Sequence, residues 1–359
     1  MKPTGAEAIK FLEKWNAAHR NVEAKARLIF EYGVSHRRLR GWAEEFRRQK
    51  VTELPKEKEV VYTSYPEFKL KPFKMKLGER DEEDIVIVMA DHHCGKITPN
   101  FNVEIYKQRM DKLLDDTMLI INLHRPIRKA HIFSVGDIVQ GENIYQGSMV
   151  EEADRGARRQ INEIAVPIWA RYILSLKQGV SEVNLYGVRG NHGVGNAKGT
   201  PPKTNWDLFF YDALKAALTN QTDIGINYSE EFSLLVNIKG FRFFLIHGDQ
   251  CKGNAAVPVI AMRRKMSEWY ANSPFHYAYC GHFHSEYQDK LNSVADYTIA
   301  PPLVTGDEWA VEKIGRISTP QQLCFGVHAR FGRTWRYSLH TDTAFLPRRF
   351  NENEGVVKQ

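Results

Sequence analysis

The sequence predicts an α/β fold, because short apolar runs typical of strands alternate with long helical stretches from Asp84 onward. The clearest run covers residues 85–90, which are all apolar, as in a strand buried on both faces. Asp91, His92 and His93 follow at once, so polar groups stand at the carboxyl end of a buried strand. Ligands of open α/β sheets bind at that edge, where an Asp-x-His pair offers an oxygen and a nitrogen to a metal.

Length and composition indicate one large α/β domain with a small appendage. The chain has 359 residues, 43% hydrophobic and 26% charged, which is typical of a soluble globular protein. Its apolar runs are too short to span a membrane, and residues 1–14 lack the apolar core of a signal peptide. We therefore expect a cytoplasmic protein. Its four cysteines are widely spaced without a C-x-x-C, which argues against a disulfide framework and a structural zinc site.

The basic charge is confined to the N-terminal part of the chain. Residues 1–80 carry 19 Lys and Arg against 11 Glu, although the whole chain has a net charge of only +7. Three helices are predicted here, over residues 6–18, 22–32 and 35–48. Gly33 suits the left-handed corner before the third helix, and Ser35 is a good N-cap for it.

The third helix resembles the recognition helix of a helix-turn-helix from transposases and resolvases. Leu39, Trp42 and Phe46 recur at helical spacing and form its packed face. The basic side chains point elsewhere, and the resemblance implies that four residues of this helix contact DNA: His36, Arg37, Arg38 and Arg40. A solvated helical hairpin or an oligomerisation arm, and hence a homo-oligomer, would show the same periodicity.

The domain boundaries follow from composition. Residues 1–50 form the helical module, and residues 51–80, with three prolines, read as an extended linker. Residues 81–345 form the α/β domain, and residues 346–359 a polar tail. Within the domain we predict helices over residues 101–124, 150–176, 206–218 and 257–270. Further strands are expected over residues 131–135, 183–188, 232–238, 241–246, 277–280, 297–300, 323–328 and 334–339. Lys239-Gly240 is a hairpin turn that begins an antiparallel part of the sheet.

Metal-type side chains end five of these strands. The clusters are Asp91-x-His93, Gly136-Asp137, Gly190-Asn191-His192, His247-Gly248-Asp249 and Gly281-His282-Phe283-His284. Their order and types resemble the calcineurin-like metallophosphoesterase superfamily, over about 260 residues. The resemblance implies a four-layer sandwich of two packed mixed β-sheets flanked by helices, and a metal-dependent phosphoesterase activity.

The resemblance also implies a role for each ligand. Asp137 bridges two divalent ions; Asp91, His93 and His284 complete the first site, and Asn191, His247 and His282 the second. Two such ions produce a bridging hydroxide as nucleophile and clamp the phosphate oxygens. The mixed nitrogen and oxygen ligands favour manganese, iron or zinc over calcium or magnesium, and we expect manganese to support activity.

His192 is the implied general acid, which protonates the leaving oxygen from above the phosphate. In most members of the superfamily an acidic residue follows this histidine and orients it. Here Gly193 stands in that place, as in phage-encoded members, so another carboxylate must orient the imidazole or the acid is weaker.

Two loops bear on the substrate. Residues 136–147 resemble the corresponding loop in the nuclease small subunit of the archaeal replicative polymerase and in phage phosphoesterases. Asn143 and Tyr145 are therefore candidates for contacts to a sugar or base, with packing of the loop as the alternative role of Tyr145. Basic residues beside the clusters are candidates for phosphate contacts, with surface charge as the alternative: Arg189, Lys198, Lys203 and Lys252.

Together these observations predict a dinuclear phosphodiesterase of the phage-type, DNA-processing subgroup, acting as a DNA-directed nuclease in the host cytoplasm. The motif alone does not exclude a phosphomonoesterase or a cyclic-nucleotide phosphodiesterase. A non-catalytic DNA-binding regulator is a third alternative. A membrane partner is not expected.

Overall fold

The computed structural model describes residues 2–18, 20–48, 82–142, 144, 153–194, 201–251, 258–305, 319–342 and 344. The chain divides into two compact units, Met1–Met75 and Lys76–Gln359, which are described separately. The predicted linker and tail lie outside the described residues. Within the described part, no helix combines the length and apolar character needed to cross a membrane.

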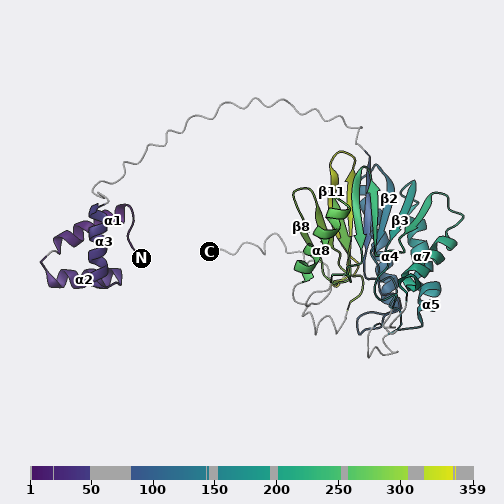
Figure 1. Cartoon of the computed structure of the whole chain (residues 1–359), viewed down its shortest axis with the longest axis horizontal. Helices are drawn as coiled ribbons and strands as arrows, with labels where there is room; N and C mark the ends of the chain where they lie inside the picture. Colours follow the sequence, from purple (N-terminus) through teal and green to yellow (C-terminus); the bar gives the residue numbers. More distant parts are fainter. Residues whose placement is uncertain are drawn as a thin grey trace, which may run out of the picture. The chain divides into compact units, whose positions relative to one another are not determined.

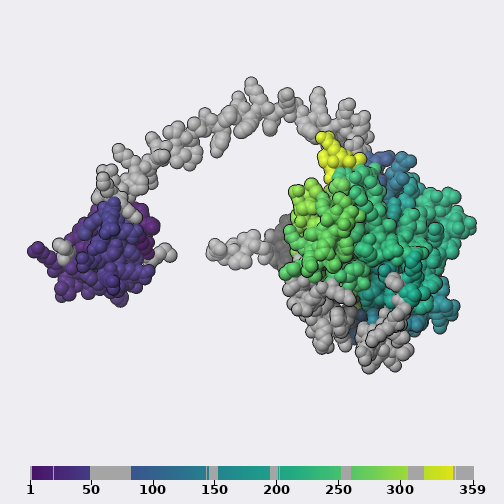
Figure 2. Space-filling view, in the orientation of Figure 1, coloured from purple at the N-terminus to yellow at the C-terminus, as the bar shows by residue number. Residues whose placement is uncertain are grey.

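The first unit contains the three predicted helices, α1 (Ala6–Ala17), α2 (Val22–Tyr32) and α3 (His36–Arg48). Gly33 ends α2 in the left-handed conformation, with φ of 61°. Phe11 lies at the centre of an aromatic core, where its ring contacts those of Trp15, Tyr32, Trp42 and Phe46. The described residues of this unit form a compact body, purple in Figure 2. A hydrophobic core of its own is what an independently folding module requires.

The first sheet of the second unit has six strands in the order β11-β10-β1-β2-β3-β4. Four strands are parallel: β1 (Glu83–Met89), β2 (Ile127–Ser134), β3 (Glu182–Gly187) and β4 (Ile224–Tyr228). The chain returns to this sheet at its end, where β10 (Gln321–His328) pairs antiparallel with β1 and β11 (Gly332–His340) closes the edge. β1 is therefore a central strand, as its apolar run predicted.

The second sheet has five strands in the order β5-β6-β7-β9-β8. Its bounds are β5 (Ser233–Ile238), β6 (Phe241–Ile246), β7 (Tyr277–Cys280), β8 (Tyr287–Lys290) and β9 (Asp296–Ile299). The predicted β5–β6 hairpin is present, but β6, β7 and β9 are mutually parallel. The expectation of an antiparallel region is confirmed for β5–β6 and for β8–β9. It was wrong for β6, β7 and β9, because α8 (Pro258–Asn272) forms a crossover between β6 and β7.

The two sheets and their helices form four layers. In β1, Ile85, Ile87 and Met89 pack toward the helices α4 (Val103–Leu123), α6 (Val166–Leu176) and α7 (Trp206–Ala217). The alternate side chains, Val86 and Val88, pack against the second sheet. The other face of the second sheet is covered by α8 through Met262 and Met266 (Figure 1). The expected sandwich of two mixed sheets flanked by helices is confirmed.

Some elements differ from the prediction. The helix expected over residues 150–176 begins, in its described part, only at α5 (Ala157–Arg159) and continues through a π-helix, η2 (Gln160–Ala165), into α6. Strands β4 and β8 were not predicted. The four cysteines are buried and free, as expected for reduced thiols that pack in the core.

Candidate metal centre

Five loops that follow strands of both sheets converge on one place. Asp91 and His93 follow β1, Asp137 follows β2, and Asn191 follows β3. His247 follows β6 in the second sheet, and His282 and His284 follow β7. All seven predicted metal ligands are linked: six have ligand atoms within 4.8 Å of those of at least two others, and the seventh, Asn191, contacts His247. They approach because parallel strands present their carboxyl ends at the same edge of a sheet.

The ligands form two groups. In the first, Nε2 of His93 lies 3.1 Å from Nε2 of His284, which is 3.9 Å from Oδ1 of Asp91. In the second, Nε2 of His247 lies 3.0 Å from Oδ2 of Asp137 and 2.9 Å from Oδ1 of Asn191. His282 belongs to this second group.

Asp137 joins the two groups. Its Oδ2 atom, which contacts His247, is also 3.9 Å from Nε2 of His93. The side chain is almost completely buried between them. This position is what a carboxylate shared by two ions requires.

The hydrogen bonds of His247 test whether these residues suit a cation. Its Nδ1 lies 2.8 Å from the carbonyl oxygen of Val135, so Nδ1 carries the hydrogen and donates it. In the neutral ring, Nε2 then presents a lone pair toward the oxygens of Asp137 and Asn191. Three electron-rich atoms in a buried place repel one another unless positive charge lies between them, and a divalent ion supplies it. The donor set therefore fits a metal.

The pKa shifts describe the same need for positive charge. Burial holds the pKa of His93 well below its usual range and lowers that of His282 to about 3, so both rings are neutral and able to bind metal. Burial raises the pKa of Asp91 to about 7. Burial also opposes the charge of His247, but attraction to nearby carboxylates, chiefly that of Asp137, raises its pKa to about 10.

The ligand loops adopt a backbone conformation that is costly for non-glycine residues. Five of the seven ligands have positive φ: Asp91 (49°), His93 (44°), Asp137 (53°), His282 (71°) and His284 (48°). Among the other described non-glycine residues only Lys239, in the β5–β6 turn, shares this feature. Such strain, about 1–3 kcal/mol per residue, persists where the surroundings impose it, commonly at functional sites.

Hydrogen bonds from distant segments impose the strained conformation at Asp91. The backbone N–H of His282 donates to both carboxylate oxygens of Asp91, at 3.0 and 2.9 Å. The backbone N–H of Leu303 donates to the carbonyl of Asp91, at 3.2 Å. Gly281 permits this approach, because a Cβ there would lie 2.6 Å from Oδ2 of Asp91.

The predicted general acid, His192, lies beside this centre. Its Nε2 is 4.0 Å from Oδ2 of Asp137, and its backbone N–H donates to Oδ1 of the same residue at 2.8 Å. Its Nδ1 is 3.2 Å from the carbonyl oxygen of Gln140, which therefore orients the ring in place of the expected carboxylate. Burial lowers the pKa of His192.

The absence of an acidic residue after His192 has a steric cause. A Cβ at Gly193 would lie 2.1 Å from Oδ1 of Asn205, which is buried and caps α7. Any larger side chain at position 193 would displace this cap. The departure from the common pattern at Gly193 thus reflects the position of α7.

His92 has a different role from its neighbours. Its ring points into the helical layer, where Nδ1 lies 3.2 Å from the hydroxyl of Tyr106. That hydroxyl accepts a hydrogen bond from Nε1 of Trp169 at 3.0 Å. His92 therefore anchors the loop that carries Asp91 and His93.

Sequence reasoning missed a buried carboxylate, Asp207, in the first turn of α7. It accepts hydrogen bonds from the loops that carry Asp137 and Asn191. The only local signal was Asn205, a residue type that often caps helices, just before the predicted helix.

The structure describes only part of the predicted substrate contacts. Arg189 donates from Nε to the backbone oxygen of Glu230, at 3.1 Å, and Lys203 pairs with the Glu230 carboxylate at 2.7 Å. Asn143, Tyr145, Lys198 and Lys252 lie outside the described residues.

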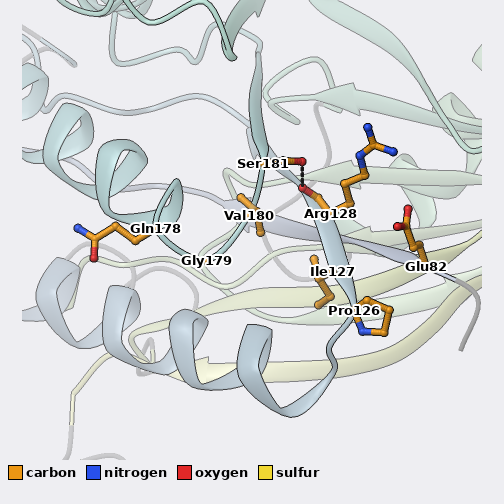
Figure 3. Close-up of a pocket in the computed structure, with 8 residues that line it drawn as sticks. All are labelled: Glu82, Pro126, Ile127, Arg128, Gln178, Gly179, Val180 and Ser181. Carbon is orange, nitrogen blue, oxygen red and sulfur yellow. Dashed lines mark hydrogen bonds between the residues drawn. The ribbon is translucent and has the colours of Figure 1, made fainter. Parts of the chain in front are cut away.

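A surface pocket of about 460 Å³ lies at the opposite ends of the strands (Figure 3). Ile127 and Arg128 line it at the start of β2, and Val180 and Ser181 just before β3. Glu82 and Arg128 are its charged residues, and none of the seven metal ligands lines it. This pocket is separate from the metal centre.

Comparisons with known proteins gave matches among solved structures, at low sequence identity and low TM-scores. No family model and no curated protein matches the chain. A dimetal phosphatase from Danio rerio shares 12% identity at a TM-score of 0.35, with 72% of this chain and 99% of the phosphatase covered. Vacuolar Protein Sorting 29 from Cryptosporidium parvum shares 13% identity at a TM-score of 0.33, covering 71% of this chain and 96% of that protein. A predicted phosphoesterase from Streptococcus pneumoniae shares 11% identity at a TM-score of 0.30, covering 71% and 98% respectively.

Proposed function

We propose that this chain is a dinuclear metal-dependent phosphodiesterase of the phage-type, DNA-processing subgroup, and that it acts as a DNA-directed nuclease in the cytoplasm. The observation that carries the proposal is the convergence of seven nitrogen and oxygen ligands, from five loops, around the shared carboxylate of Asp137. Manganese is the metal that we expect to support activity, because this donor set suits a borderline cation.

Metal ions held by these residues would supply a hydroxide nucleophile near neutral pH and polarise the phosphate. His192 performs the acid step. Because its Nδ1–H is held by the carbonyl of Gln140, Nε2 is the atom that carries the mobile proton. In the imidazolium form, Nε2 gives this proton to the departing oxygen as the phosphorus–oxygen bond breaks. Five of the seven metal ligands have positive φ, and their loops hold these side chains in place. The ligands therefore need little rearrangement during the reaction.

The basic face of α3 supports DNA as the substrate. Arg37, Arg38 and Arg40 are exposed, as is His36. Arg40 also pairs with Glu44, so Arg37 and Arg38 are the main candidates for phosphate contacts. A basic exposed helix in a small module suits a tether to nucleic acid.

Hydrolysis of bis(p-nitrophenyl) phosphate with added Mn²⁺ tests the proposal. The wild-type chain should hydrolyse this diester, whereas Asp137→Asn, which weakens the shared ligand, and His93→Ala, which removes one, should reduce the rate to that of the reaction without protein. Asp212→Asn is a matched control, because Asp212 is an exposed carboxylate on α7. It should leave the rate unchanged.

A substrate panel separates the proposed nuclease from the alternatives. It should include monoesters, cyclic nucleotides, and single- and double-stranded DNA and RNA, each with several metals. Strong activity on monoesters with none on diesters or nucleic acid would show that the nuclease proposal is wrong. DNA binding that is lost on deleting residues 1–50, without hydrolysis under any condition, would instead indicate a non-catalytic regulator.

A further inference from the structure

Asp207 is a fully buried carboxylate that is not one of the seven predicted ligands but contacts two of the ligand loops. Its Oδ2 accepts hydrogen bonds from the backbone N–H groups of Asp137, at 3.0 Å, and Gly190, at 2.8 Å. Its Oδ1 accepts a third from the backbone N–H of Ile138, at 3.1 Å. One side chain therefore joins the loop after β2 to the loop after β3.

The first turn of α7 fixes this carboxylate. The side chain of Asn205 accepts from the backbone N–H of Asp207 at 2.8 Å and donates to the carbonyl of Gly190 at 2.7 Å. The backbone N–H of Trp206 donates to the carbonyl of Gly193 at 2.9 Å. Gly190 is thus held at its N–H and its carbonyl, and Gly193 at its carbonyl, so the backbone is fixed on both sides of Asn191 and His192.

The two ligand loops also touch each other, so a small displacement of one loop would move the other. A Cβ at Gly190 would lie 2.1 Å from Oδ1 of Asp137. The same Oδ1 accepts the backbone N–H of His192. Because of this close approach, any shift of Gly190 changes the position of the Asp137 carboxylate.

We propose that Asp207 is a positioning residue, which sets the geometry of Asp137, Asn191 and His192 through their backbones and adds a buried negative charge behind the metal site. This inference rests on the proposed function. Its physical basis is that groups behind metal ligands orient them and offset the charge of the ions, and that their loss commonly reduces metal affinity about 10–100-fold. Asp207 acts through the backbone and is not itself a ligand.

Asp207→Asn is the direct test, because it keeps the shape but replaces one oxygen with an NH₂ group. In either orientation of the amide, at least one backbone N–H loses its acceptor. We expect the full-length variant to bind Mn²⁺ about 10–100-fold more weakly in isothermal titration calorimetry. At low Mn²⁺ its kcat on bis(p-nitrophenyl) phosphate should fall, and added Mn²⁺ should partly restore it.

Asp212→Asn, the same substitution on an exposed face of α7, should change neither Mn²⁺ affinity nor kcat. If Asp207→Asn lowers only the melting temperature, and its Mn²⁺ affinity and kcat match wild type below that temperature, the proposal is overturned. Should Asp207→Asn fail to fold, Asn205→Ala decides the matter, because it keeps the Asp207 carboxylate but removes the hydrogen bonds that hold it, those of Asn205 to the backbone N–H of Asp207 and to the carbonyl of Gly190. Unchanged Mn²⁺ affinity in Asn205→Ala would then overturn the proposal, and weaker affinity would support it.

The same titrations separate this inference from the proposed function. A wild-type chain that binds no Mn²⁺ would refute both. A wild-type chain that binds Mn²⁺ and hydrolyses the diester, with an Asp207→Asn variant that does so equally well, would refute only the role of Asp207.

Discussion

At the scale of single residues, substrates with different leaving groups can test whether His192 donates a proton. A proton from Nε2 matters most when the departing oxygen is strongly basic, as in the alkoxide released from DNA. The p-nitrophenolate ion is weakly basic and leaves without a proton. His192→Ala should therefore lower kcat/KM on a DNA oligonucleotide by about 10²–10⁴-fold. The loss on bis(p-nitrophenyl) phosphate should be much smaller.

The kcat/KM values on DNA and on bis(p-nitrophenyl) phosphate should both be measured at saturating Mn²⁺, so that any change in metal affinity does not contribute. A loss of equal size on the two substrates would contradict proton donation. It would show instead that His192 stabilises the charge on the phosphate in both reactions, a role that does not depend on the leaving group.

The metal ligands could be predicted from the sequence because each is a residue type that binds metals and each also follows a predicted strand. Asp91 or His247 alone would carry little weight, but each directly follows a strand. Asp207 had no such signal, since it is one of 43 acidic residues and lies within a helix. The carbonyl that orients His192 was equally hidden, because every residue has one and only the fold brings that of Gln140 to the ring.

At the scale of secondary-structure elements, strands with a hydrophobic pattern were predictable, whereas the two edge strands β4 and β8, which lack such a pattern, were not. β1 was evident because both of its faces are buried. β8, by contrast, contains Gln288, Asp289 and Lys290 and forms the edge of the second sheet, so it has no buried face to reveal it. β4 is also an edge strand, and Gly225 and Asn227 interrupt its pattern.

The π-helix η2 was not predicted, and it places Gln160 where it holds the loop after Asp137. The side-chain oxygen of Gln160 accepts from the backbone N–H of Gly141 at 2.9 Å. Its NH₂ group donates to the carbonyls of Gly141, at 3.3 Å, and Arg155, at 2.6 Å. The side chain is completely buried. Isolated π-helical turns are frequent at functional sites. Here the π-helix begins at Gln160, the residue that makes these contacts.

Gln160→Glu should therefore be strongly destabilising. A carboxylate cannot donate, and its second oxygen would face two carbonyl oxygens in a buried place. We expect the free energy of unfolding to fall by about 2 kcal/mol or more in urea denaturation. Gln178→Glu, at an exposed position beside the surface pocket of Figure 3, should change it by less than about 0.5 kcal/mol. Similar values for the two variants would contradict the role given to Gln160.

At the scale of the whole molecule, the division into two units predicts that DNA binding and small-substrate hydrolysis can be separated. Arg37→Ala with Arg38→Ala removes two positive charges from the exposed face of α3, far in sequence from every metal ligand. This double variant should hydrolyse bis(p-nitrophenyl) phosphate at the wild-type rate. Its affinity for DNA should fall, and the slope of log K against log salt should decrease by about 2, because each phosphate contact contributes about 0.9.

Lys10→Ala with Arg20→Ala is the matched control, since it removes the same charge from exposed positions outside α3. Fluorescence anisotropy with labelled duplex DNA at several salt concentrations measures both variants. If the two lower the affinity equally, the effect is one of net charge, and the assignment of α3 as the contact helix is wrong.

The wide spacing of the metal ligands along the chain has a consequence for how the protein is made. The first ligand is residue 91 and the last is residue 284, and both sheets contribute. During translation, a growing polypeptide therefore lacks part of the ion-binding set until residue 284 has left the ribosome. The N-terminal module, whose last helix ends at Arg48, can fold long before then. Any hydrolytic activity thus begins only after residue 284 has emerged, when the N-terminal module can already have folded.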